Sequence, residues 1–190
     1  MRKLKLQMQT SVDGFVASRE GQLDFMVWDW DDELNRYVDQ ITEPVELILL
    51  GRVLAEGFIP TWKSRLEADP NDASARKFVE TPKIVFSRTL SESKWDNTTV
   101  AKGDLSDEVK RLKESTGGDI IAYGGGTFVS DLIRHNLIDE YNFFVNPAAI
   151  SEGMTIFRQP GDKVRLKLEN ARAFDCGIVG LRYTPAGAES

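Results

Sequence analysis

The chain opens with alternating apolar and polar residues and continues with several short apolar runs. In "KLKLQMQT" (3–10), leucine and methionine alternate with lysine and glutamine, which is the two-residue period of a strand. The run "VELILLGR" (45–52) is almost continuously apolar, has the length of a strand and is closed by a glycine. Further strands are expected at "PKIVFSRT" (82–89), "DIIAY" (119–123) and "IDEYNFFVNP" (138–147), with a weaker one at "TTVAKG" (98–103).

Helical spacing of apolar residues occurs between these runs. In "DDELNRYVDQI" (31–41), the apolar positions recur at three- and four-residue intervals and acids fill the first turn, so we expect a helix from about Asp31. The segment 52–66 is helical at its start and is predicted to be interrupted at Pro60. Three more helices are expected within 70–80, 105–116 (with Ser106 as N-cap) and 127–136.

Strands and helices therefore alternate through most of the chain, and the last segment has a different pattern. Residues 163–185 are typical of an antiparallel hairpin that turns near Asp175–Gly177. This order predicts an α/β fold, a three-layer sandwich with a mostly parallel central sheet and a C-terminal antiparallel hairpin. We expect a single domain over residues 1–190, because the polar stretch 63–80 is too short to be a second one.

Composition narrows the class of protein. The 190 residues are 41% hydrophobic and 28% charged, which is a globular balance. A net charge of −6 argues against a nucleic-acid partner. The single cysteine, Cys176, excludes an internal disulfide and fits a reducing compartment. No signal peptide precedes the first strand and no apolar run reaches the roughly 18 residues of a membrane span, so we expect a cytoplasmic protein without a membrane partner.

The stretch "DIIAYGGGTFVSDLI" (119–133) is the strongest chemical signal in the chain. A buried strand runs into three glycines, Gly124, Gly125 and Gly126, and a helical pattern begins at once with Thr127. Free N–H groups at a helix N-terminus bind phosphate, and glycine lets the anion approach the backbone. The alternative is a tight turn without a ligand. The spacing matches neither the ordinary dinucleotide fingerprint nor a P-loop.

Two other expected strands end in a similar way. Gly51-Arg52 closes one, and Ser87-Arg88-Thr89 closes the other. The carboxyl ends of parallel strands are where ligands bind in open α/β sheets, and arginine is well suited to a phosphate dianion. Either arginine could instead be a solvated surface residue. Together with the glycine run, Arg52 and Arg88 suggest a ligand with several phosphate groups, one of them apart from the others. NADPH has this arrangement, because it carries a pyrophosphate and a separate 2′-phosphate.

These motifs together resemble a known family. The order "SVDG" (11–14), "LLGR" (49–52), "VFSRT" (85–89) and "AYGGGTFVSDLI" (122–133) is similar to the dihydrofolate reductase fold. The likeness is closer to the reductase domain of bacterial riboflavin biosynthesis and its free-standing relatives. It extends from about Leu4 to Tyr183, nearly the whole chain.

The resemblance implies roles for individual residues. Gly51 and Arg52 would bind cofactor phosphate, while Ser87 and Arg88, with Thr89 beside them, would lie at the adenosine 2′-phosphate. The glycines 124–126 and Thr127 would hold the pyrophosphate and the neighbouring ribose. On the substrate side the implied residues are Asp13, Gly14, Phe15 and Pro147. The candidate catalytic carboxylates are Asp13, Asp32 and Glu33, because folate reductases use a carboxylate on the first helix.

The chain also departs from the family pattern. Val53, Leu54 and Ala55 stand after "GR" where the family usually has a threonine and an aromatic residue. The loop "NPAAISEGMTIF" (146–157) keeps Pro147 and Gly153 but places Ser151-Glu152 between them, so the substrate pocket is expected to differ. A zinc-dependent deaminase is excluded, because His135 and Cys176 alone cannot form its metal site, and we expect no metal.

Two functional hypotheses follow. The first is an NADPH-dependent reductase that transfers hydride to a small heterocycle, either a ribosylaminopyrimidine of riboflavin biosynthesis or a dihydropteridine. The second is a nucleotide-binding protein that keeps the fold and has lost catalysis. The apolar content of 138–147 and of the C-terminal hairpin also suggests a homodimer, although a strand packed in its own sheet gives the same pattern.

Overall fold

A computed structural model describes residues 1–158 and 163–187 and contains eight strands and five helices in that part of the chain. The strands are β1 (Leu4–Thr10), β2 (Val45–Gly51), β3 (Lys83–Phe86), β4 (Thr98–Ala101), β5 (Asp119–Ala122), β6 (Glu140–Val145), β7 (Leu166–Ala173) and β8 (Val179–Pro185). The helices are α1 (Asp32–Thr42), α2 (Arg52–Ala68), α3 (Ala73–Glu80), α4 (Leu105–Glu114) and α5 (Gly126–Arg134).

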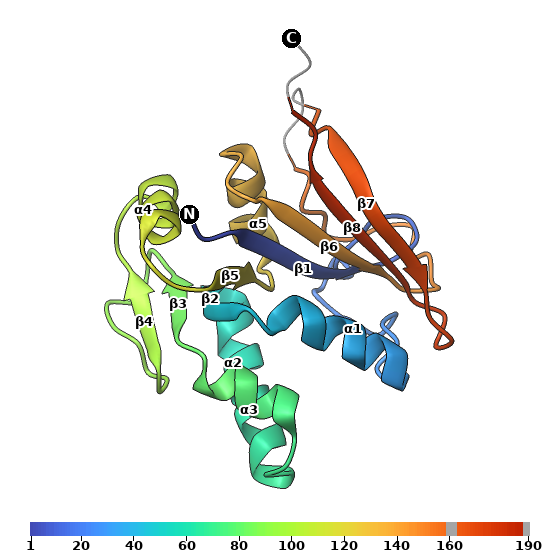
Figure 1. Ribbon diagram of the computed structural model, residues 1–190, viewed down its shortest axis with the longest axis horizontal. Helices are drawn as coiled ribbons and strands as arrows, with labels where there is room; N and C mark the ends of the chain where they lie inside the picture. Colours follow the sequence, from blue (N-terminus) through green and yellow to red (C-terminus); the bar gives the residue numbers. More distant parts are fainter. Residues whose placement is uncertain (159–162, 188–190) are drawn as a thin grey trace.

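All eight strands form one sheet in the order β4-β3-β2-β5-β1-β6-β8-β7 (Figure 1). The first six strands in this order, β4, β3, β2, β5, β1 and β6, are parallel to one another, whereas β8 is antiparallel to both β6 and β7. The predicted mostly parallel sheet and C-terminal hairpin are therefore confirmed. Because β2, β5 and β1 are adjacent and parallel, their carboxyl ends meet at one edge of the sheet.

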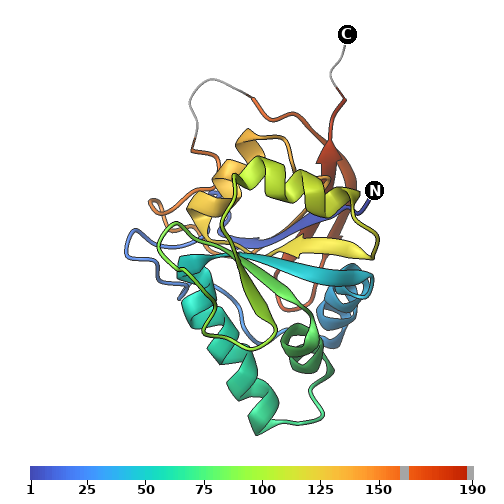
Figure 2. The ribbon, with the colours of Figure 1, turned by 90° about the vertical axis from the view of Figure 1, so that its left-hand side faces the viewer.

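Helices cover both faces of the sheet. Helices α4 and α5 lie on one face and α1, α2 and α3 on the other (Figures 1 and 2). Each face has its own hydrophobic core, one built around β1 with α4 and α5, the other around β2 with α1, α2 and α3. Leu47, Ile48, Leu49 and Leu50 are all buried because successive side chains point into the two cores in turn.

Helix α2 continues through Pro60 to Ala68, so the predicted interruption was wrong. Pro60 is exposed, and its ring nitrogen cannot donate a helical hydrogen bond. The sequence prediction ended the helix there for this reason. Aromatic packing supports the helix on both sides of Pro60: Phe58 before it and Trp62 after it contact Phe78 of α3, with ring centroids 5.1 and 5.2 Å away. These contacts hold the second half of α2 against α3.

The N-cap of α4 is Asp104 rather than the predicted Ser106. The Asp104 carboxylate accepts hydrogen bonds from the backbone N–H groups of Ser106 and Asp107, at 2.8 and 3.2 Å. Ser106 is instead buried in the first turn. Aspartate and serine are both good N-caps. Because the helix begins at Leu105, Asp104 is the residue at the N-cap position.

Candidate cofactor site at the carboxyl edge of the sheet

The three strand ends that carry the predicted phosphate groups are neighbours in the sheet. Gly51 at the end of β2 pairs with Phe86 of β3, and its N–H donates to the Gly124 carbonyl beyond β5 at 3.1 Å. The Phe86 ring also stacks on that of Phe128 in α5, with centroids 5.1 Å apart. The structure thus brings Gly51-Arg52, Ser87-Arg88-Thr89 and the glycine run together at one edge.

Two of the three glycines are required by the backbone itself. Gly124 and Gly125 have φ angles of 142° and 71°, which side chains other than glycine's rarely tolerate. A Cβ at Gly125 would also lie 3.4 Å from the Gly51 Cα atom, so the two strand ends approach closely at this point. A tight turn therefore explains both residues without a ligand.

Gly126 differs, because it is the first residue of α5 and has helical backbone. Among residues 1–158 and 163–187, the nearest atom from outside its own helix to a Cβ built there is Arg158 Nη2, 3.2 Å away. The helix has no side-chain N-cap, since Gly125 occupies that position. The first-turn N–H groups and the space beside Gly126 form a cradle that a side chain would fill, and this geometry fits a phosphate group.

Arg52 opens α2 from the end of β2. Its guanidinium donates to the Glu56 carboxylate one turn later at 2.8 Å, and the Arg52 side chain is 36% exposed. Val53, where the family pattern has a threonine, is 71% exposed in the same turn. Arg52 is consequently directed along its own helix by Glu56, and an anion would have to compete with that carboxylate.

The loop after β3 carries Arg88 in an exposed position. The Ser87 hydroxyl accepts hydrogen bonds from the N–H groups of Thr89 and Leu90, at 3.1 and 3.0 Å. This small turn fixes the backbone on both sides of Arg88. The Ser87 oxygen is used to shape the turn, and Arg88 is exposed within it.

The predicted substrate loop is anchored by Asp13. Its carboxylate accepts hydrogen bonds from the N–H groups of Ile150 and Ser151, at 3.2 and 2.7 Å. A side-chain hydrogen bond from Ser11 and these backbone donors lower the pKa of Asp13. Asp13 thereby joins the loop that contains Gly14 and Phe15 to the loop that follows Pro147, and it is a carboxylate at neutral pH.

Two of the three acids at the start of α1 make structural contacts. Asp31 is the N-cap, with its Oδ1 accepting from the Leu34 N–H at 2.8 Å, while Glu33 forms an ion pair with Arg172 of β7. Asp32 is exposed. The sequence identified Asp32 and Glu33 as candidates but did not single out Asp31, although an aspartate just before a helical pattern is a common N-cap signal.

Sequence analysis missed Asn146, which is fully buried just beyond β6. Its Nδ2 donates to Gln9 Oε1 at 3.1 Å, and its Oδ1 accepts from the Val27 N–H at 2.8 Å. Asn146 therefore fastens the 11–31 loop to the sheet edge. Trp30, at the end of that loop, stacks near Phe144 with centroids 6.2 Å apart.

Three buried polar atoms lie on the α1 side of the sheet without a hydrogen-bond partner among the described residues. They are Gln7 Oε1, Tyr37 Oη and Asn142 Oδ1. Gln7 and Asn142 are paired across β1 and β6, and burial raises the pKa of Tyr37. Buried polar atoms are as a rule satisfied by water or by a ligand, so this part of the sheet can accept hydrogen bonds from a polar molecule.

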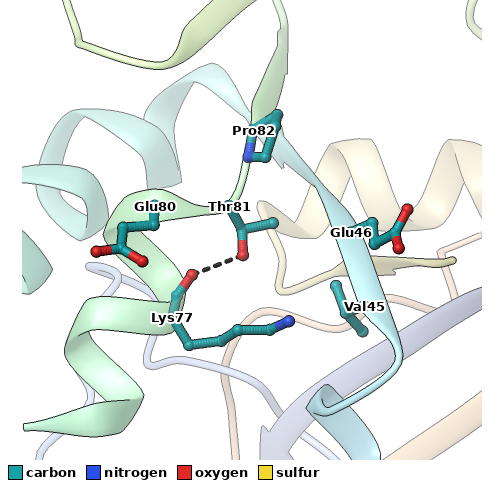
Figure 3. A pocket seen from close by; sticks show the side chains of 6 residues that line it. All are labelled: Val45, Glu46, Lys77, Glu80, Thr81 and Pro82. Atoms are coloured by element: carbon teal, nitrogen blue, oxygen red, sulfur yellow. Dashed lines mark hydrogen bonds between the residues drawn. The ribbon is translucent and has the colours of Figure 1, made fainter. Parts of the chain in front are cut away.

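A separate hollow of about 410 Å³ lies at the opposite edge of the sheet, where β2 and β3 begin. Val45, Glu46, Lys77, Glu80, Thr81 and Pro82 line it (Figure 3). Thr81 Oγ1 donates to the Lys77 carbonyl at 2.6 Å, closing α3. The hollow is distant in topology from the strand carboxyl ends and shares no residue with them.

Neither a metal centre nor a membrane helix is found in the described part of the chain. Residues 1–158 and 163–187 contain no cluster of three or more histidine, cysteine or acidic side chains suited to a metal ion. Within the same residues, no helix combines the length and apolarity needed to span a bilayer.

The sheet order and its parallel strands define an α/β protein, and its fold is similar to that of a dihydrofolate reductase. The family model of the RibD C-terminal domain matches residues 2–180. The chain belongs to that family.

Three known proteins are similar to this chain over nearly their whole length. The Bacillus subtilis protein YyaP is 30% identical over 187 residues, covering 96% of this chain and 94% of YyaP. A putative riboflavin biosynthesis protein from Shewanella has a TM-score of 0.70 at 19% identity, covering 97% of this chain and 99% of its own. A dihydrofolate reductase from Enterococcus faecalis, complexed with NADP(H), has a TM-score of 0.62 at 13% identity and 96% coverage of both chains.

Proposed function

We propose that this protein is an NADPH-dependent reductase that transfers hydride to a C=N or C=O bond of a small heterocycle. The observation that carries the proposal is the meeting of three groups at one sheet edge: Arg52 after β2, Arg88 after β3 and the glycine cradle before α5. Membership in the RibD C-terminal domain family supports the reductase class. The NADP(H) held by the similar Enterococcus reductase supports the choice of cofactor.

Different residues of this chain would bind different parts of the cofactor. The first-turn N–H groups of α5, beside Gly126 and Thr127, would hold the pyrophosphate, because a helix N-terminus favours an anion. Arg88 would pair with the 2′-phosphate through a charge-assisted bond. When bound, NADPH supplies the hydride, and the chain supplies position and electrostatics.

The substrate would lie on the α1 side, where loops join the ends of β1 and β6. Asp13 and Asn146 hold these loops in place through their backbone contacts. The half-buried Trp30 ring, which stacks on the buried Phe144, would border a planar heterocycle there. The substrate class we propose is a ribosylaminopyrimidine or a dihydropteridine, as the family resemblance suggests.

One observation favours the non-catalytic alternative. Asp13 is bound by two backbone N–H groups and Glu33 is paired with Arg172, so two of the three candidate proton donors are already engaged. Asp32 is the exposed exception. The catalytic roles of Asp13, Asp32 and Glu33 stay predictions.

Two measurements test the proposal. Calorimetric titration with NADPH and NADH should show tighter binding of NADPH. Oxidation of NADPH, followed by its absorbance in the presence of a panel of pterins and ribosylaminopyrimidines, should then reveal turnover of at least one compound. Binding without turnover across the panel would favour the nucleotide-binding alternative, and absence of binding would refute both.

A further inference from the structure

Three oxygen atoms that lack a hydrogen-bond partner among the described residues gather beneath α1: Gln7 Oε1, Asn142 Oδ1 and Tyr37 Oη. Gln7 of β1 and Asn142 of β6 are opposite each other in adjacent strands, so their side chains lie side by side on one face of the sheet. Tyr37 of α1 lies over the same face, because it interacts with the charges of Glu140 and Arg182. These two residues are the neighbours of Asn142 along β6 and across on β8.

The orientation of the Asn142 amide is fixed by its own hydrogen bonds. Its Nδ2 donates to Glu140 Oε1 at 3.0 Å and to the Leu6 carbonyl at 3.4 Å. Turning the amide over would remove both bonds and place Oδ1 against the Glu140 carboxylate. Because Asn142 is only 1% exposed, its Oδ1 is a buried acceptor that needs a donor from outside the chain.

The Tyr37 hydroxyl supplies the complementary group. The ring is held by Phe144 and Phe174, with centroids 6.2 and 5.5 Å away. Burial raises the pKa of Tyr37, so the hydroxyl stays protonated at neutral pH and can donate a hydrogen bond. The three oxygens thus offer two acceptors and one donor. A water molecule complements this set, since it can donate two hydrogen bonds and accept the third.

We propose that Gln7, Asn142 and Tyr37 bind one structural water molecule, which donates to the two amide oxygens and accepts from the Tyr37 hydroxyl. The water joins α1 to β1 and β6. A neutral ligand fits better than a metal or ammonium cation, because the positive charge of Arg182 acts on the same hydroxyl. Gln7 is half-buried, so the water can exchange with solvent on that side. The water site is independent of the proposed reductase function.

The direction of one change in stability tests the site. Tyr37→Phe removes only the hydroxyl, so with a bound water the variant loses a hydrogen bond. Its melting temperature should then fall by roughly 2–4 °C, the shift that one hydrogen bond gives in a chain of this size. Removing a hydroxyl without a partner would instead leave the melting temperature unchanged or raise it. Tyr183→Phe is the matched control and should change it little, because Tyr183 is half-buried in the core on the opposite face of the sheet.

Two further measurements examine the water itself. Gln7→Met removes another of its partners, so the double variant Gln7→Met/Tyr37→Phe should lose less stability than the sum of the two single variants. A high-resolution crystal structure of the wild type should show one water bonded to all three oxygens.

Four results would overturn the water site. They are a Tyr37→Phe variant that melts at or above the wild-type temperature, strictly additive losses in the double variant, and electron density in which the Gln7 amide bonds directly to Asn142. The fourth is a wild-type melting temperature that is higher in potassium or ammonium chloride than in sodium chloride at equal concentration, which would assign the three oxygens to a cation.

Discussion

The carboxylate of Asp31 joins the start of α1 to the turn of the β7–β8 hairpin, because its Oδ2 accepts a hydrogen bond from the Cys176 N–H at 3.0 Å. Its Oδ1 caps α1 at the Leu34 N–H. One side chain thus fixes two segments that are 145 residues apart in the sequence. Both bonds are stronger to the ionised carboxylate, and together they lower the pKa of Asp31 from its ordinary value of 3.8.

Replacing Asp31 should destabilise the fold in a pH-dependent way. Asp31→Ala removes the cap and the hairpin contact, so we expect a melting temperature several degrees lower at pH 7. Because the folded-state pKa is lowered, the stabilisation is present above the unfolded pKa and is lost as the pH falls through the folded one. The difference in melting temperature between the wild type and Asp31→Ala should therefore shrink as the pH is lowered from 7 into the acid range. Asp29→Ala, at an exposed loop position, is the control.

Lys83 should make stability rise with pH in the alkaline range. It is 2% exposed, donates to the carbonyls of Val79 and Thr81, and burial lowers its pKa from 10.5 to about 8. Between these two values the unfolded chain holds a proton that the folded chain has lost, so raising the pH favours folding by up to about 1.4 kcal/mol per unit.

Denaturant titrations between pH 8 and 10 test this slope. The difference in unfolding free energy between wild type and Lys83→Met should increase with pH over that range. Lys110→Met, on the exposed side of α4, serves as the control and should show a constant difference. A constant difference for Lys83→Met as well would show that the Lys83 amine titrates normally.

Substitution of Gly125 should lower the stability of the fold more than the affinity for the cofactor. Its φ of 71° is disfavoured for residues with a Cβ, and the Gly51 Cα lies 3.4 Å from where that atom would be. We expect Gly125→Val to cost roughly 1–3 kcal/mol of stability, measured by chemical denaturation. A variant of normal stability that has lost NADPH affinity would show instead that the cradle, not the turn, requires this glycine.

Arg88 should determine the preference for NADPH over NADH. Arg88→Gln is expected to remove a charge-assisted bond worth roughly 1.5–3 kcal/mol, which is about one to two decades of affinity for NADPH. NADH affinity should stay the same, because that cofactor lacks the 2′-phosphate. Arg52→Gln should have a smaller effect, since Arg52 is already paired with Glu56. Equal losses for both cofactors in Arg88→Gln would assign Arg88 to another phosphate.

The homodimer stays a prediction, and its contact surface is expected on the C-terminal hairpin rather than on β6. Tyr141, Phe143 and Phe144 of β6 are buried within the chain, whereas Leu168 of β7 is 52% exposed at the sheet edge. Light scattering at micromolar concentration should give twice the 21.4 kDa mass of one chain. Leu168→Glu should lower that mass if the hairpin forms the contact, and a wild-type mass of 21.4 kDa would refute pairing.

The sequence by itself determined the layered α/β architecture and the edge at which the candidate site lies. Apolar periodicity is a local property, so the runs ending in Gly51, Phe86 and Tyr123 could be recognised as strands without knowing their neighbours. Alternation with helices then implied parallel strands, whose carboxyl ends must share an edge. The phosphate-binding candidates followed from their place after those strands.

Tertiary structure alone decided contacts between segments that no local pattern links. The Asp31–Cys176 and Arg158–Thr127 hydrogen bonds depend on how loops pack against the sheet edge, and Arg158 follows an apolar stretch with no motif of its own. The same packing carried α2 through Pro60. It also distinguished Gly126 from its two neighbours, because φ angles and nearby atoms are set by the whole fold and three successive glycines look identical in sequence.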